Sequence, residues 1–124
     1  MNEASEEVGG EPLASPGSPV SRILVGSVPI PGTDLENRVY EITLAPGCAV
    51  PAHTHPVAGV GYIVAGHGVS RYQGQDAVEL APGGTFIDHA DLLHETFANR
   101  SATEPLVFVV SYAVQRNGAV IRLS

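Results

Sequence analysis

The chain has 124 residues and a mass of 12.9 kDa, which is enough for one domain with a hydrophobic core. Its 44% hydrophobic and 15% charged residues exclude a wholly disordered protein. The net charge of −7, carried with six arginines and no lysine, argues against nucleic acids and membrane surfaces as partners. The sequence has no long apolar run to span a membrane and no secretory signal, so we expect a cytoplasmic protein.

The first 19 residues differ in composition from the rest of the chain. They contain four of the 13 acidic residues, three prolines and no basic residue. A segment of this kind has too little apolar surface to form a core. We therefore predict a disordered acidic tail over residues 1–19 and one folded domain over residues 20–124.

The folded part is predicted to be a series of short strands. In the segment around Tyr40, Ile42 and Leu44 the apolar residues recur with a period of two, which is typical of a half-buried strand. Gly, Pro, Asn or Asp stands in almost every gap, and this pattern predicts an all-β sandwich or barrel. The predicted strands are Arg22–Val28, Asn37–Leu44, Val60–Ala65, Val69–Gln73, Ala77–Leu80, Thr85–Asp88, His94–Ala98, Leu106–Val114 and Ala119–Leu123.

Four of the five histidines fall into two groups. His53 and His55 are two positions apart, so on a strand both imidazoles point to the same face. His89 and His94 follow a Pro-Gly turn further along the chain. A His-X-His pair alone is more often core or solvated than metal-binding. The turn before the pair and the third histidine, His94, favour a divalent metal site.

The first histidine group resembles the first motif of the cupin family. Gly47 is followed after five residues by His53-Thr54-His55, and Gly59 and Gly66 then stand at the intervals that the family motif prescribes. The family has a glutamate where this chain has Gly59.

The second histidine group resembles the second cupin motif. Gly83 is followed after five residues by His89-Ala90-Asp91, and then by His94. His89 and Asp91 replace the usual proline and glycine. The resemblance covers about Asn37 to Val114 and implies a jelly-roll, or double-stranded β-helix, barrel.

The resemblance implies that His53, His55 and His94 bind a divalent metal ion, with the family's carboxylate ligand absent at Gly59. Three neutral imidazoles would leave the charge of the ion uncompensated, which favours an anionic substrate. On this hypothesis Gly59→Glu would tighten metal binding. The ligand types do not determine whether the ion is Fe, Mn, Zn, Ni or Cu. A pocket that has lost its metal remains the alternative.

The leading hypothesis is a metal-dependent enzyme that acts on a small anionic substrate. Dioxygenase chemistry is the first expectation, and isomerase or lyase chemistry stays open. His89 is a candidate acid–base residue at the pocket mouth. Asp88 and Asp91 are candidates to hydrogen-bond a ligand imidazole from behind. The alternative is a cupin that binds or senses a small molecule without catalysis.

The segment Leu106–Val114 is apolar on both faces. One face can fill the barrel, whereas the face with Val107 and Val109 needs a cover. The strand within Val20–Val28 could provide it, in its own chain or across a two-fold axis. We expect a homodimer.

Overall fold

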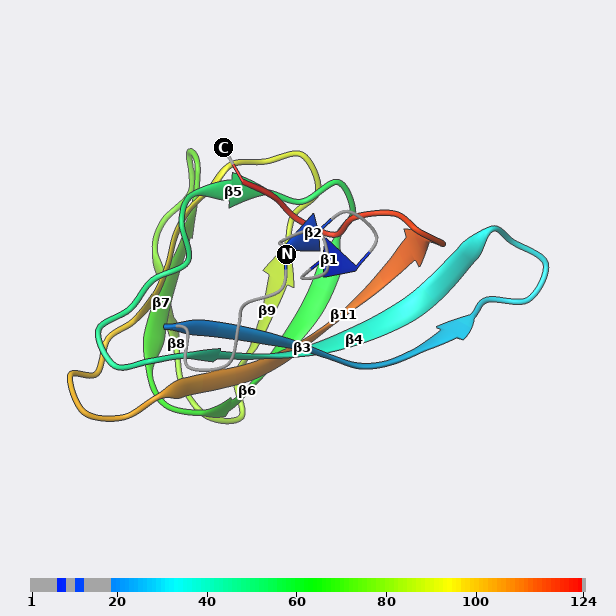
Figure 1. Cartoon of the computed structure of the whole chain (residues 1–124). Helices are drawn as coiled ribbons and strands as arrows, with labels where there is room; N and C mark the ends of the chain where they lie inside the picture. The colour runs from blue at the N-terminus through cyan, green and yellow to red at the C-terminus, as the bar shows by residue number, and fades with distance from the viewer. Residues whose placement is uncertain (1–6, 9–10, 13–18, 124) are drawn as a thin grey trace.

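The computed structural model describes residues 7–8, 11–12 and 19–123, and all strands from β3 to β12 form two five-stranded antiparallel sheets (Figure 1). One sheet has the order β3-β4-β11-β6-β9 and the other β12-β5-β10-β7-β8. The predicted all-β fold is confirmed. The tail predicted over residues 1–19 lies largely outside the described residues. In its described part, β1 (Glu7–Val8) and β2 (Glu11–Pro12) pair with each other. No helix in the described ranges is long and apolar enough to cross a membrane.

The strand boundaries follow the sequence pattern with small shifts. The C-terminal segment predicted as Ala119–Leu123 is a strand only at Arg122–Leu123, and a short strand at His53–Thr54 is added. The first sheet contains β3 (Val20–Pro29), β4 (Leu35–Leu44), β6 (Gly59–Ala65), β9 (Thr85–Asp88) and β11 (Leu106–Gln115). The second contains β5 (His53–Thr54), β7 (Gly68–Tyr72), β8 (Val78–Leu80), β10 (His94–Asn99) and β12 (Arg122–Leu123).

The core lies between the two sheets and is built from alternate residues of each strand. On β4 and β11 the register pairs Ile42 with Phe108 and Tyr40 with Val110, so their side chains fill the interior together. Phe86 and Phe97 pack edge-on at a ring-centroid distance of 5.3 Å, and both contact Phe108. This aromatic cluster adjoins the histidines and keeps that end of the interior apolar.

A buried arginine fixes the C-terminal segment against β4. Arg38 is 1% exposed, and its guanidinium donates hydrogen bonds to the carbonyl oxygens of Gly118 (2.8 Å) and Gln115 (3.2 Å). These bonds to the turn after β11 place Val120, which follows the turn, inside the fold. Its carbonyl contributes to the site described below.

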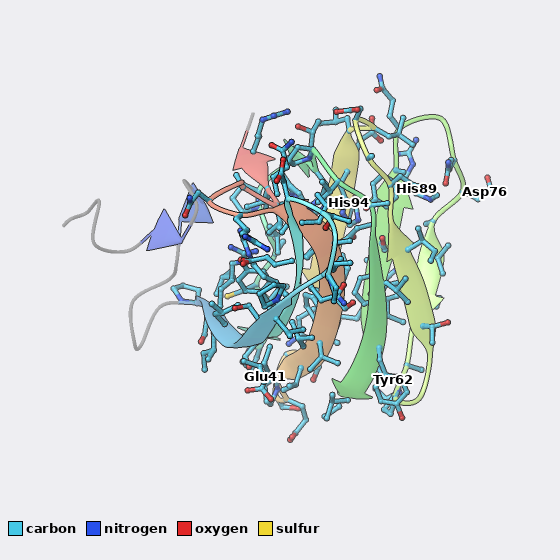
Figure 2. The ribbon with its side chains drawn as sticks, turned by 90° about the vertical axis from the view of Figure 1, so that its right-hand side faces the viewer. Glu41, Tyr62, Asp76, His89 and His94 are labelled. Carbon is cyan, nitrogen blue, oxygen red and sulfur yellow. The ribbon has the colours of Figure 1, made fainter. Side chains whose placement is uncertain are left out.

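The outer face of the first sheet carries many exposed apolar side chains. β3 pairs with β4 in its own chain, with Ile23 opposite Glu41, so it extends the sheet at its edge and does not cover the face of β11. Cover by this strand in its own chain, one of the two predicted alternatives, is therefore wrong. Glu41 and Tyr62 point away from the interior at the lower side of Figure 2. The large exposed apolar side chains on β3, β6 and β9 are Ile23, Val25, Val28, Val60, Tyr62, Val64 and Ile87.

Candidate metal centre

Three histidines from two neighbouring strands meet inside the fold. His53 on β5 lies opposite His94 on β10, and His55 follows β5 immediately. All three are 3% exposed or less. One ring nitrogen from each lies within 4.8 Å of the others, and the Nε2 atoms of His53 and His55 are 3.1 Å apart. In Figure 2, His94 lies between the two sheets. The three residues predicted from the spacing are thus brought together.

Backbone carbonyls fix the protonation of two of these rings. The Nδ1 of His53 is 2.7 Å from the Pro51 carbonyl oxygen, and the Nδ1 of His55 is 2.7 Å from that of Val120. A carbonyl oxygen only accepts hydrogen bonds, so each Nδ1 carries a hydrogen. In the neutral rings each Nε2 therefore presents a lone pair. Two lone pairs at 3.1 Å repel each other, and a cation between them removes that repulsion.

His94 has a ring nitrogen at the histidine cluster without a hydrogen-bond partner among the described residues. Its Nε2 is 2.7 Å from the Ser70 hydroxyl, and its ring stacks on Tyr72 at a centroid distance of 3.9 Å. Its Nδ1 is buried and has no hydrogen-bond partner in the described part of the chain. A buried nitrogen of this kind is costly unless something binds it. The residues present therefore fit a metal ion, which the three histidines could bind.

Burial favours the neutral form of His94 and His53. It lowers the pKa of His94 to about 3, with His53 and His55 also lowering it and Asp88 opposing the shift. Burial is also the main cause that lowers the pKa of His53. The neutral ring is the form that binds a metal ion.

The histidine cluster forms one wall of a small pocket. The pocket encloses about 390 Å³, including the space at its open mouth. Apolar side chains form most of the wall: Val20, Ile42, Val50, Phe97, Phe108 and Ile121. Arg22 and Asp88 are the charged side chains among the lining residues. The guanidinium of Arg22 lies over the Tyr40 ring, 4.5 Å from its centroid. A small molecule bound against this lining would lie close to the histidines.

Asp88 lies beside the cluster, which differs from its predicted place behind a ligand imidazole. Its Oδ2 is 3.4 Å from His55 Nε2, and its Oδ1 is 3.9 Å from His94 Nδ1. Both distances are to the nitrogens that face the cluster. The alternation along β9 could have predicted this position of Asp88. Asp88 is two residues from the buried Phe86, so both side chains point inward.

Two tyrosines hold the carboxylate of Asp88. Tyr72 donates to Oδ1 at 2.9 Å, and Tyr112 donates to Oδ2 at 2.6 Å. Burial, followed by the negative charge of Asp88, raises the pKa of both tyrosines well above the usual value. Both hydroxyls therefore stay protonated and act as donors.

Gly59 does not face open space at the histidine cluster. A Cβ at this position would lie 2.4 Å from Cε1 of Tyr112, because the tyrosine ring fills the adjacent volume. The prediction that Gly59→Glu would tighten metal binding assumed open space at residue 59, and the Tyr112 ring fills that space. A side chain at residue 59 must first displace Tyr112.

His89 and Asp91 are not brought to the pocket. The His89 ring packs edge-on against the Tyr72 ring at 4.8 Å, and it lines a different cavity together with Ser70 and Asp76. Figure 2 shows His89 further from the interior than His94. Asp91 is an exposed turn residue with a φ of 58°, and its backbone N–H donates to the His55 carbonyl. An acid–base role for His89 remains a prediction.

Comparison with known proteins agrees with the fold and with the motif spacing. The family model described as a cupin domain matches residues 40–112. The chain belongs to the cupin family. The match contains all three histidines, Asp88 and both tyrosines that bind it. No curated protein matches the sequence of this cupin.

Several solved structures share the fold of this cupin at low sequence identity. The DMSP lyase DddQ from Ruegeria pomeroyi is 20% identical, with a TM-score of 0.68 over 95% of this chain and 58% of that one. KdgF from a Halomonas species is 18% identical, with a TM-score of 0.64 over 94% of both chains. An oxalate oxidase in complex with glycolate is 24% identical, with a TM-score of 0.61 over 70% of this chain. The chain spans 45% of that oxidase, and these likenesses show the fold alone.

Proposed function

We propose that this cupin is a metal-dependent enzyme that acts on a small anionic substrate. The observation that carries the proposal is that three histidine nitrogens converge on the wall of a pocket. Two have lone pairs fixed by carbonyl contacts, and the third has no hydrogen-bond partner among the described residues. His53, His55 and His94 would hold the ion. A bound divalent ion supplies Lewis-acid polarisation of a substrate group, and a redox-active ion also exchanges electrons.

Arg22 supports an anionic substrate. Its side chain lines the same pocket as the histidines, within an otherwise mainly apolar wall. A guanidinium there can pair with a carboxylate or a similar anion, and the low-polarity surroundings strengthen that pairing. The apolar wall also limits the entry of water around the bound group. Oxalate oxidase with glycolate, a fold relative, offers small carboxylates as the first compounds to try.

The reaction type is proposed with dioxygenase chemistry first, and with isomerase or lyase chemistry as alternatives. The fold relatives include both an oxidase and a lyase, so the fold is compatible with either. A non-catalytic cupin that binds or senses a small anion is the second candidate. The structure gives it one supporting observation, since the predicted acid–base residue His89 lies outside the pocket.

The test uses the metal-loaded protein with glycolate, oxalate and the neutral analogue glycolamide. Calorimetry should show binding of at least one carboxylate and none of the amide. Arg22→Gln should weaken carboxylate binding about tenfold or more, because a charge-assisted hydrogen bond is lost. Arg116→Gln, at an exposed position, is the matched control and should bind as the wild type does. Equal binding of amide and carboxylate would contradict the anionic substrate.

Turnover separates the two candidate functions. Product should exceed the protein concentration many times over if the cupin is an enzyme, and oxygen uptake should accompany it if the reaction is oxidative. Tight carboxylate binding without product under air or under nitrogen would favour the binding module.

The proposal includes a homodimer formed by the outer face of the first sheet. Val60, Tyr62 and Ile87 lie on neighbouring strands of that face, where the register pairs Val60 with Ile87, and all three are exposed. Such a continuous apolar surface is unusual on a monomer. Light scattering should give about twice the chain mass of 12.9 kDa. Tyr62→Glu should shift the protein toward the monomer, and a wild type with the mass of one chain would contradict the dimer.

A further inference from the structure

Asp88 occupies the position directly opposite Gly59. The two residues are partners in the register between β6 and β9. The side chains of directly opposed residues project from the same face of a sheet. The chain therefore supplies a carboxylate from β9, on the face where the motif of β6 lacks one.

The missing side chain at Gly59 and the carboxylate of Asp88 are linked through Tyr112. The ring of Tyr112 fills the volume that a Cβ at Gly59 would need, with contacts of 2.4 Å and 2.7 Å to Cε1 and Cδ1. The hydroxyl of the same tyrosine donates to Asp88 Oδ2 at 2.6 Å. Glycine at position 59 thus makes room for the group that orients Asp88.

The carboxylate of Asp88 faces two imidazole nitrogens, one without a hydrogen to donate and one too distant for a hydrogen bond. His55 Nδ1 carries its hydrogen toward the Val120 carbonyl, so in the neutral ring Nε2 has only a lone pair to present to Asp88 Oδ2 at 3.4 Å. His94 Nδ1, without a partner in the described residues, lies 3.9 Å from Oδ1. The two tyrosine hydroxyls satisfy one position on each carboxylate oxygen, and each oxygen keeps a further lone pair for another partner.

We propose that Asp88 is a fourth protein ligand of the metal ion, held in its binding orientation by the hydroxyls of Tyr72 and Tyr112. This inference rests on the metal centre of the proposed function. Asp88 contributes a negative charge, so the centre has three neutral ligands and one anionic ligand. Tyr72 and Tyr112 are positioning residues that act through Asp88.

The test is metal affinity, measured by competition with a chelator for Zn²⁺ and Mn²⁺. Asp88→Asn keeps the shape of the side chain and removes its charge, and it should weaken binding of both ions by more than tenfold. Asp76→Asn changes an exposed carboxyl that does not line the histidine pocket and should bind as the wild type does. Tyr112→Phe keeps the ring beside Gly59 and removes the hydroxyl, so we expect a smaller loss of affinity. Asp88→Asn with wild-type affinity would overturn the inference.

A second measurement does not depend on a variant that folds. In a crystal structure of the metal-loaded wild type, anomalous scattering would locate the ion. An Asp88 oxygen should lie about 2.0–2.2 Å from it. An ion bound by the three histidines with Asp88 outside bonding distance would overturn this inference and leave the proposed function intact. A wild type that binds no metal ion would overturn both.

Discussion

The Ser70 hydroxyl lies 2.7 Å from His94 Nε2, the ring nitrogen that points away from the histidine cluster. Ser70 is on β7, next to β10, and it is the polar contact that sets the rotation of this imidazole. His53 and His55 have backbone carbonyls in the same role, so each of the three rings is oriented from behind. Contacts of this kind hold the metal-binding nitrogens in place before the ion arrives.

Removing the Ser70 hydroxyl should therefore weaken metal binding without removing a ligand. We expect Ser70→Ala to lower the affinity for Zn²⁺ about 10–100-fold, measured by chelator competition. Ser111→Ala removes an exposed hydroxyl on β11 and is the matched control. Equal affinities in the two variants would show that Ser70 does not orient His94.

A methyl group at residue 59 should destabilise the protein. Gly59→Ala places its Cβ against the Tyr112 ring, and overpacking of this kind costs about 1–3 kcal/mol. Gly26→Ala is the control, because a Cβ there meets nothing within 4 Å and the backbone has no positive φ. Urea unfolding of the two variants gives the comparison. A free energy of unfolding for Gly59→Ala no lower than that of the control would mean that Tyr112 does not occupy this volume.

The stability of the metal-free protein should fall as the pH falls below neutrality. The folded state lowers the pKa of His53 and His94 below the ordinary value of 6.5, so the unfolded chain binds more protons. The contribution of these residues is fully present above about pH 6.5. It is lost as the pH drops toward the folded-state pKa of His94, about 3.

Thermal unfolding at pH values from 7.5 to 5 measures this effect. Surface carboxyls titrate mainly at lower pH, so the histidines dominate this range. His94→Gln should show a shallower decline of Tm than the wild type, whereas His67→Gln, at an exposed position, should follow the wild type. Parallel Tm profiles for the wild type and His94→Gln would contradict the burial of a neutral His94.

The sequence predicted the fold and the three histidines because both depend on local spacing. The period of two around Tyr40 and Ile42 fixes which side chains enter the core, and the strands follow from it. The placement of His53 and His55 needs only the alternation along one strand. Their meeting with His94 needed the additional information in the spacing of the two cupin motifs.

The arrangement around Asp88 could not be read from local spacing. It depends on the register between β6 and β9, which sets Asp88 opposite Gly59, and on Tyr112 from a third strand. The separation of His89 from the pocket likewise depends on the Tyr72 ring, which contacts both the His89 ring and the His94 ring. Such contacts are set by tertiary packing, because residues from separate strands determine them.

The metal content of the purified protein tests the central claim most directly. We predict about one equivalent of a divalent ion per chain after loading and removal of excess metal, measured by elemental analysis. His53→Ala, His55→Ala and His94→Ala should each lose that ion, whereas His67→Ala should retain it, because His67 is exposed and outside the cluster. Full metal content in all three cluster variants, or a wild type that binds no ion, would contradict the account.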